Sequence, residues 1–311
     1  MSAIEPTLEA LPNPVLRYFL ATRPAFLSVT FCGWLIGIGA AIHSGVAHDG
    51  AAAALTLAFA LVAHAGVNVL NDYYDAQIGT DAINVERIFP FTGGSRFIQN
   101  GVLSLAQTGW FGAALFGAVI GAGMWLIALS ARGLFWIGAA GLAIGWAYSA
   151  PPLKLNSRGL GELCVATGFA LVVVGTDYVQ RAEFDSLPWI AAMPYALLVT
   201  NLLYINQFPD READRRTGKW HLVVRLGTAR ARWGYLAIAA AAFAWLALAV
   251  QAGALPSRGL IALLAALPSG LAARELWRHA AQPAQLAGAI KLTIVAALAH
   301  GLLLSAALMS A

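Results

Sequence analysis

The sequence predicts an all-α, polytopic membrane protein with nine transmembrane helices around a central cavity, closed by cytoplasmic cap loops. Of its 311 residues, 59% are hydrophobic and 11% are charged, and the mean hydropathy is +0.70. Soluble domains carry about 25% charged residues, so this composition excludes an ordinary soluble fold. Apolar stretches of about 20 residues recur along the chain, and such stretches cross a bilayer as helices because lipid offers the backbone no hydrogen-bond partners.

Nine apolar stretches are long enough to be counted as spans. They cover residues 25–45, 51–70, 106–129, 133–149, 160–180, 188–206, 231–251, 259–273 and 287–309. Residues 1–24 contain three prolines before Arg23 and no apolar core, so they do not resemble a cleaved signal peptide. We therefore expect residues 1–311 to form a single membrane domain.

The basic residues are distributed unevenly between the two sides of the membrane. If the connections are numbered alternately, all but three of the 19 Lys and Arg residues fall on one side, and the exceptions are Arg132, Arg181 and Arg258. Basic connections stay in the cytoplasm, so we expect a protein of the inner (cytoplasmic) membrane with its N-terminus and active site facing the cytoplasm. Topology and lipid headgroups account for the pI of 9.3, and no nucleic-acid partner is expected.

Two cytoplasmic connections, about 71–105 and 207–230, are much longer than the others. Loops that exceed about 12–15 residues are usually functional or disordered. These two contain apolar residues among polar ones, including Phe91 in the first and Trp220 in the second, which is not typical of disorder. We expect them to fold as caps over a cavity.

An acid-rich cluster stands at the start of each cap: Asn71-Asp72-Tyr73-Tyr74-Asp75 and Asn206-Gln207-Phe208-Pro209-Asp210-Arg211-Glu212-Ala213-Asp214. Seven of the 15 acidic residues lie in these clusters or just after the first, namely Asp72, Asp75, Asp81, Glu86, Asp210, Glu212 and Asp214. A spacing of four residues places side chains on one helical face, which relates Asn71 to Asp75 and Asn206 to Asp210. Pro209 predicts that the sixth span ends near Gln207 and that a new helix begins there.

Carboxylates that converge repel one another unless a cation neutralises them. Oxygen ligands from Asp and Asn suit Mg²⁺, whose coordination is typically completed by substrate phosphates. Neither cluster includes His or Cys, which disfavours zinc. Basic groups for an anionic substrate are Arg96 after Gly93-Gly94, Lys154, and Arg211 and Lys219 beside the second cluster. The sequence therefore predicts a Mg²⁺-dependent site for a phosphorylated substrate.

These two clusters, together with Tyr148-Ser149-Ala150-Pro151-Pro152-Leu153-Lys154 and Thr217-Gly218-Lys219, resemble the UbiA superfamily of intramembrane prenyltransferases over essentially the whole chain. The first motif of that family usually reads Asn-Asp-x-x-Asp-x-x-x-Asp, whereas here Gly79 takes the last place and Asp81 follows it. This variant and the stretch Thr92-Gly93-Gly94-Ser95-Arg96-Phe97-Ile98-Gln99 resemble the MenA branch, which prenylates 1,4-dihydroxy-2-naphthoate. The second motif, with Gln207-Phe208-Pro209, is less typical of that branch.

The resemblance implies the transfer of a polyprenyl group from polyprenyl diphosphate to a small aromatic acceptor. The implied Mg²⁺ ligands are Asn71, Asp72, Asp75, Asp81, Asp210 and Asp214. The implied diphosphate-binding residues are Arg96, Lys154, Arg211, Lys219 and Asn206. The implied catalytic residues are Asn71, Asp72, Asp75, Asp210, Asp214, Lys154 and Tyr148, with Tyr148 or another aromatic residue facing the allylic carbon.

Two kinds of alternative stay open at the level of sequence. Within the enzyme class, the acceptor could be 4-hydroxybenzoate, a haem or chlorophyll precursor, or a lipid ether. Outside it, a cation-coupled transporter would also place Asp residues in a membrane domain. Against a transporter, both acidic clusters fall on the same side of the membrane under long caps instead of at its midplane.

Overall fold

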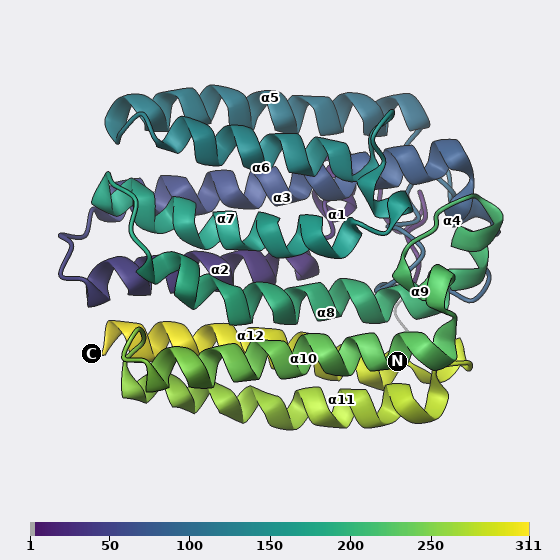
Figure 1. Cartoon of the computed structure of the whole chain (residues 1–311). Helices are drawn as coiled ribbons and strands as arrows, with labels where there is room; N and C mark the ends of the chain where they lie inside the picture. Colours follow the sequence, from purple (N-terminus) through teal and green to yellow (C-terminus); the bar gives the residue numbers. More distant parts are fainter. Residues whose placement is uncertain (1–3, 311) are drawn as a thin grey trace.

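The computed structural model describes residues 4–310, and within that range the chain forms helices and turns without any strand (Figure 1). The elements are α1 (Pro14–Ala21), α2 (Pro24–His43), α3 (Gly50–Ile78), α4 (Thr80–Ile83), α5 (Leu105–Leu129), α6 (Leu134–Ser149), η1 (Leu155–Arg158), α7 (Gly161–Arg181), α8 (Leu187–Arg216), α9 (Leu222–Leu226), α10 (Thr228–Gln251), η2 (Ser257–Ala265), α11 (Ala266–His279), η3 (Pro283–Gln285) and α12 (Ala287–Met309).

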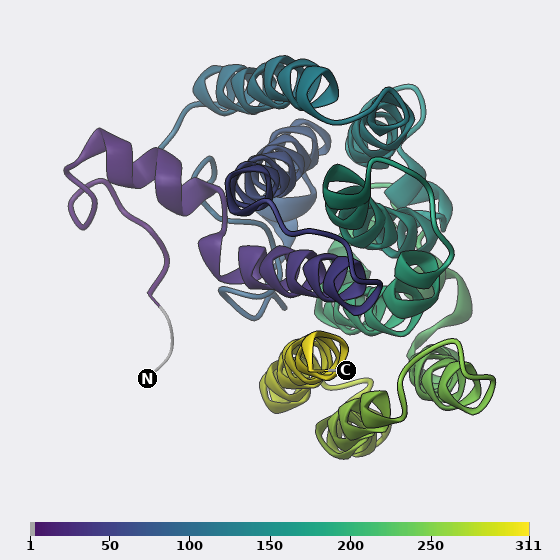
Figure 2. The same cartoon turned by 90° about the vertical axis from the view of Figure 1, so that its left-hand side faces the viewer.

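Each of the nine predicted spans corresponds to a helix of the bundle. Eight are long and apolar enough to cross a membrane: α2, α3, α5, α7, α8, α10, η2 with α11, and α12. The ninth, α6, is apolar but has only 16 residues. Figure 2 shows the bundle end-on, with α5 at one edge and α10 to α12 at the opposite edge. The prediction of an all-α polytopic membrane protein is confirmed.

Helix α8 forms the centre of the bundle. In its most apolar window 72% of the residues are buried, against 17% for α5, which exposes its side chains to the surrounding lipid. Three tyrosines around α8 are completely enclosed, Tyr195 and Tyr204 on α8 itself and Tyr235 on α10. Each buried hydroxyl has a partner, as expected for a polar group in an apolar core: for example, Tyr204 Oη donates to the carbonyl of Ala231 over 2.8 Å. The helix that carries the second acidic cluster is therefore held on several sides.

The prediction of a helix break at Pro209 is wrong. Helix α8 continues without interruption from Leu187 to Arg216, and both Pro194 and Pro209 lie inside it. A proline inside a helix removes one backbone hydrogen bond at a cost of about 3 kcal/mol. Pro209 is buried between neighbouring elements, and this tertiary packing offsets that cost. Asn206, Asp210 and Asp214 consequently project from one continuous helix.

Helix α3 likewise extends two turns beyond the predicted span and ends at Gly79, whose φ of +79° reverses the chain direction. A residue in this left-handed conformation commonly ends a helix, and glycine adopts it without steric cost. The short helix α4 follows at once and places Asp81 beside the end of α8. Both acidic clusters and both caps lie at the right-hand end of the bundle in Figure 1. The other end carries the α5–α6 connection with Arg132, the end of α7 with Arg181 and the start of η2 with Arg258.

Candidate active site

A cavity of about 680 Å³ extends through the bundle from the end that carries the acidic clusters. At that end it is lined by polar residues of α3, α4, α8 and the caps, including Asp75, Asp81, Asp210 and Asp214. Further in, it is lined by apolar residues of α3, α5, α6 and α7, such as Phe116 and Leu171. We call the end of the cavity that contains Asp75, Asp81, Asp210 and Asp214 the acidic head, and the part lined by apolar residues of α3, α5, α6 and α7 the apolar arm.

The first cluster points across the cavity from α3. Asn71 Nδ2 donates to Asp75 Oδ2 over 3.1 Å, which confirms that residues four apart share one helical face. The same Nδ2 also donates to Ser149 Oγ over 2.9 Å, so the end of α6 fixes the orientation of the amide. Among residues 4–310 the side-chain carbonyl oxygen of Asn71 accepts no hydrogen bond, and Asn71 lines the cavity.

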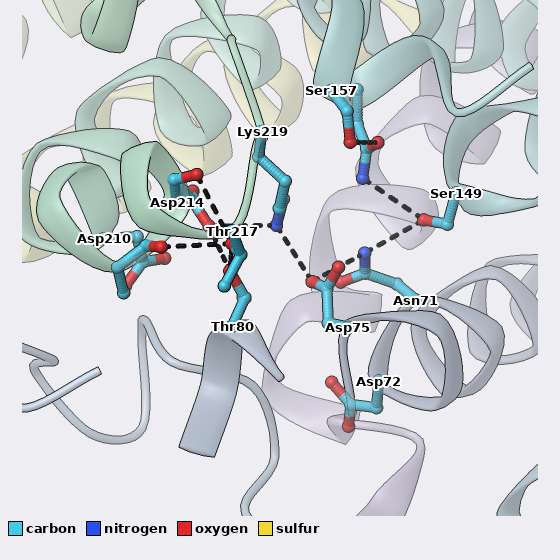
Figure 3. Close-up of polar contacts among 12 residues, drawn as sticks. Asn71, Asp72, Asp75, Thr80, Ser149, Ser157, Asp210, Asp214, Thr217 and Lys219 are labelled. Atoms are coloured by element: carbon cyan, nitrogen blue, oxygen red, sulfur yellow. Dashed lines mark hydrogen bonds and ion pairs between the residues drawn. The ribbon is translucent and has the colours of Figure 1, made fainter. Parts of the chain in front are cut away.

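Asp72 has a different environment from its neighbours. It is buried, and both carboxylate oxygens accept hydrogen bonds from the backbone N–H of Ser95, over 3.3 and 3.2 Å. It does not line the cavity, and Figure 3 shows its carboxylate turned away from Lys219. In this structure Asp72 holds the glycine-containing stretch of the first cap.

Asp81 enters the cavity from α4. Its Oδ2 is buried and has no hydrogen-bond partner among the described residues. Burial and the neighbouring carboxylates of Asp75 and Asp72 raise the pKa of Asp81 well above its ordinary value. Gly94 makes this position possible, because a Cβ at residue 94 would lie 2.3 Å from Asp81 Oδ2.

The second cluster is bound to the first cap by two side-chain hydrogen bonds. Asn84 Nδ2 donates to Asp210 Oδ1 over 2.6 Å, and Thr80 Oγ1 donates to Asp214 Oδ1 over 3.1 Å. Asp214 is buried and Asp210 is half-buried. These contacts couple the end of α8 to the segment that follows α3, so the two halves of the chain form one site.

Lys219 lies between the two clusters, as Figure 3 shows. Its Nζ is 3.1 Å from Asp75 Oδ2 and 3.2 Å from Asp214 Oδ1. Burial acts to lower the pKa of Lys219, but attraction to Asp214, Asp75 and Asp81 outweighs it and raises the pKa well above its ordinary value. The side chain is therefore a permanent cation that partly neutralises the carboxylates of both motifs.

His221 is a buried residue of the second cap that sequence reasoning missed. Its Nδ1 accepts the backbone N–H of Val224, which caps α9, and this contact leaves the proton on Nε2. Nε2 lies 3.1 Å from Asp214 Oδ2 and donates to it. Sequence reasoning also missed Thr80, Asn84 and Ser95. Isolated residues of these types in a cap have no spacing or motif that marks them as part of a site.

The remaining predicted residues divide into two groups. Tyr148 and Asn206 line the cavity. Arg96, Lys154 and Arg211 do not. Arg96 Nη1 donates to the backbone carbonyl of Asp81 over 2.5 Å. The Lys154 side chain forms no hydrogen bond or ion pair with another residue in the range 4–310.

Residues 32–307 match the UbiA prenyltransferase family. The chain belongs to the UbiA prenyltransferase family. It is accordingly a membrane prenyltransferase, and the MenA-like resemblance is confirmed by its relatives.

Curated relatives of this UbiA prenyltransferase include 1,4-dihydroxy-2-naphthoate octaprenyltransferases. The protein from Mycobacterium tuberculosis (strain ATCC 25618 / H37Rv) is 34% identical over 231 residues, which cover 73% of this chain and 75% of that one. The protein from Bacillus subtilis (strain 168) is 27% identical over 297 residues, which cover 93% and 90% of the two chains.

Solved structures share the fold. A UbiA homolog from Aeropyrum pernix K1 aligns with a TM-score of 0.66 at 21% identity, covering 88% of this chain and 96% of that one. A UbiA homolog from Archaeoglobus fulgidus, solved with DMAPP and Mg²⁺, aligns with a TM-score of 0.59 at 16% identity, covering 94% and 99%.

The oxygen donors of this UbiA prenyltransferase fit a hard divalent cation. The unpartnered Oδ2 of Asp81 and the unpartnered Oδ1 of Asn206 are both buried polar atoms of cavity-lining residues. Among residues 4–310 no three acidic, His or Cys side chains are already grouped as ligands of one ion. Carboxylate and amide oxygens are the donors that Mg²⁺ takes in proteins, and it completes its coordination with water and phosphate oxygens.

Proposed function

We propose that this prenyltransferase transfers a polyprenyl group from a polyprenyl diphosphate to 1,4-dihydroxy-2-naphthoate with the help of Mg²⁺. One observation supports the donor class above all others: the acidic head and the apolar arm belong to the same cavity. The names of the curated relatives support the acceptor. The Gly79/Asp81 variant of the first motif and the stretch 92–99 support it further.

The dimensions of the cavity match an amphiphilic donor. Along α3 the lining runs from Thr56 to Asp75, which are 19 residues apart and therefore about 28 Å apart along the helix axis. This length is close to the thickness of the hydrocarbon core, about 30 Å. A long isoprenoid tail fits the apolar arm, while its diphosphate reaches the acids. Ile120 and Met124, both exposed on α5, line the arm and provide a route for the tail into the membrane.

The residues that would hold Mg²⁺ are Asn71, Asp75, Asp81, Asp210 and Asp214, with Asn206 beside them. When bound, the ion supplies positive charge to the diphosphate and to the pyrophosphate that departs. Asp72 stays a predicted ligand, although its carboxylate here accepts the N–H of Ser95. Arg96, Lys154 and Arg211 stay predicted diphosphate contacts that require a movement of their side chains toward the cavity.

The chain itself performs three tasks in this proposal. Lys219 donates hydrogen bonds to phosphate oxygens as negative charge develops on the leaving group. Tyr148 lies in the cavity wall, where an aromatic ring stabilises a neighbouring allylic cation. The caps, bound to the acidic clusters through Asn84 and Thr80, exclude water that would otherwise capture this cation.

The reaction balances without an added base. The C–O bond of the donor breaks and releases pyrophosphate, and a C–C bond forms between the allylic carbon and the ring carbon that bears the carboxylate. The electron pair of the bond to the carboxylate returns to the ring as carbon dioxide leaves. With 4-hydroxybenzoate, in contrast, a ring proton would have to be removed and the carboxylate would be retained.

A product assay tests the proposal. Purified protein with Mg²⁺ and octaprenyl diphosphate should convert 1,4-dihydroxy-2-naphthoate to a prenylated product that lacks the carboxylate, and should prefer it to 4-hydroxybenzoate. Selectivity from pocket size alone is about 1–3 kcal/mol, so we expect preference and not absolute exclusion. A prenylated 4-hydroxybenzoate with no naphthoate product would contradict the acceptor assignment. Solute transport without prenyl transfer would contradict the proposal altogether.

The location of the reaction is a further part of the proposal. By the element bounds, most of the basic residues belong to the same end of the bundle as the acidic clusters, while Arg132, Arg181 and Arg258 belong to the opposite end. Basic connections stay in the cytoplasm. We therefore assign the enzyme to the cytoplasmic membrane with its active site facing the cytoplasm, where water-soluble pyrophosphate is released.

A further inference from the structure

A second cavity, of about 650 Å³, lies beside the active site. It is lined by residues between 4 and 11 of the N-terminal segment, the start of α2, residues between 89 and 97 of the first cap, and α12, and it opens to the surface beside the exposed Ile4. Its wall is almost entirely apolar and contains four phenylalanines, Phe26, Phe89, Phe91 and Phe97. Such a volume and lining are typical of a site for a small, largely apolar ligand.

The two cavities share a wall. Arg23, Phe26, Val29, Phe91 and Leu202 line both of them. A ligand in the second cavity would therefore lie next to a donor in the first. A transferase has to bring its two substrates into contact, and two adjoining cavities provide such a contact when the donor as proposed above fills the first.

Arg23 is the cation at this shared wall. Its φ of +59° places it in the left-handed region, which is unusual for a residue other than glycine and costs about 1–3 kcal/mol. Its Nη2 donates to the carbonyl of Phe91 over 3.1 Å, whereas its buried Nε has no hydrogen-bond partner in the described part of the chain. The guanidinium lies 4.8 Å from the centroid of the Phe26 ring. The Arg23 guanidinium, whose Nε–H has no acceptor, therefore lies beside the ring of Phe26.

The only other charged residue in this wall is Glu5, and its charge is already neutralised. Glu5 Oε1 lies 2.7 Å from Arg87 Nη2, and Glu5 Oε2 lies 3.5 Å from Arg96 Nε. Burial acts to raise the pKa of Glu5, but hydrogen bonds from Asn100 and Arg87 outweigh it and lower the pKa. Arg23, in contrast, has no carboxylate oxygen within 4.0 Å among residues 4–310, although its charge attracts the more distant carboxylate of Asp72. The second cavity therefore favours an anion at one point of its wall.

We propose that the second cavity binds the aromatic acceptor, with its carboxylate on Arg23 and its ring among the phenylalanines. This inference rests on the proposed function and identifies the part of the site that recognises an aromatic acid. The Arg23 side chain is half-buried, and a carboxylate would accept the N–H of its buried, unpartnered Nε. The same contact places the ring carbon that bears the carboxylate at the boundary between the two cavities, where the allylic carbon of the donor arrives.

The first test compares two ligands without any donor. Wild-type protein should bind 1,4-dihydroxy-2-naphthoate about tenfold or more tightly than 1,4-dihydroxynaphthalene, which lacks the carboxylate, because a hydrogen bond to a charged group contributes that much. Arg23→Gln should bind the two compounds equally. Arg230→Gln removes an exposed arginine of α10 and should keep the preference for the acid. A preference for the acid that survives in Arg23→Gln would overturn the proposal.

The second test narrows the cavity without touching Arg23. Ser28 lines the second cavity and not the first, so Ser28→Phe should raise the KM for the naphthoate tenfold or more and leave the KM for octaprenyl diphosphate unchanged. Equal effects on both KM values, or none on the acceptor, would overturn the proposal. Absence of product in wild-type protein would refute the proposed function, and the donor-free binding test would still decide the role of the second cavity.

Discussion

The ammonium group of Lys219 lies 3.1 Å from the carboxylate of Asp75, although 144 residues separate them in the chain. A second carboxylate, that of Asp214, lies 3.2 Å from the same ammonium. Three charges from α3, α8 and the second cap are thereby gathered in a buried site. Two converging carboxylates repel each other, so the lysine adds an ionic contact between the motifs to the hydrogen bonds that Asn84 and Thr80 donate.

Replacement of this lysine should make the stability of the protein depend on a metal ion. Lys219→Met leaves two buried carboxylates without a counter-ion, which costs about 3–5 kcal/mol and should lower the midpoint of thermal unfolding. Added Mg²⁺ should raise that midpoint more in the variant than in wild-type protein. Lys154→Met is the control, since Lys154 does not line the cavity. Equal midpoints for Lys219→Met and wild type, with or without Mg²⁺, would contradict the bridging role.

Gly94 should be required for the position of Asp81. A Cβ at residue 94 would lie 2.3 Å from Asp81 Oδ2, so Gly94→Ala should displace the carboxylate and reduce kcat tenfold or more. Gly101→Ala is a matched control: both glycines have φ near +70°, but a Cβ at residue 101 meets nothing within 4 Å. The two variants share the backbone strain and differ in the clash. If both variants lost the same turnover, backbone strain and not the clash with Asp81 would explain the loss, and the prediction would be wrong.

Asp75 and Asp210 should both be essential for turnover. Asp75→Asn and Asp210→Asn each remove one negative charge from opposite halves of the site, and the loss of one such electrostatic contact costs about a hundredfold in kcat. Both variants should still insert into the membrane, because asparagine has nearly the same shape. Glu183→Gln, an exposed change at the opposite end of the bundle, should leave turnover unaffected. Full activity in either aspartate variant would remove that residue from the catalytic set.

The orientation in the membrane is testable by labelling. Glu86 in the first cap and Glu183 after α7 are exposed at opposite ends, and the native Cys32 and Cys164 are buried. A membrane-impermeant thiol reagent added to intact cells should label Glu183→Cys and leave Glu86→Cys unlabelled. The reverse pattern would place the acidic clusters outside the cytoplasm and would contradict the proposed location.

The sequence predicted the nine spans well because a membrane helix is specified by local apolar composition. It also predicted that Asn71 and Asp75 meet, since both lie on one turn of one helix. The boundary at Pro209 was wrong, because the local preference of proline was outweighed by the packing of α8 inside the bundle. Features that depend on residues close in sequence, such as the spans and the Asn71–Asp75 contact, were therefore predicted correctly. The boundary at Pro209 depends on tertiary packing and was not.

Contacts between distant segments could not be derived in the same way. Nothing in the sequence shows that Thr80 donates to Asp214, that His221 orients the same carboxylate, or that Arg96 turns toward Glu5. Arg23 was counted only as a topological charge, although the fold places it between two cavities. These relationships depend on how the caps return to the bundle, which is a property of the tertiary fold.

The most direct test of the central claim measures three products of one reaction. Wild-type protein would be incubated with Mg²⁺, octaprenyl diphosphate and 1,4-dihydroxy-2-naphthoate labelled with ¹³C in its carboxylate. We predict labelled carbon dioxide, pyrophosphate and a prenylated product without carboxylate in equal amounts, and none of the three with Asp75→Asn. Pyrophosphate release without labelled carbon dioxide, or a prenylated product that keeps the label, would contradict the proposed reaction.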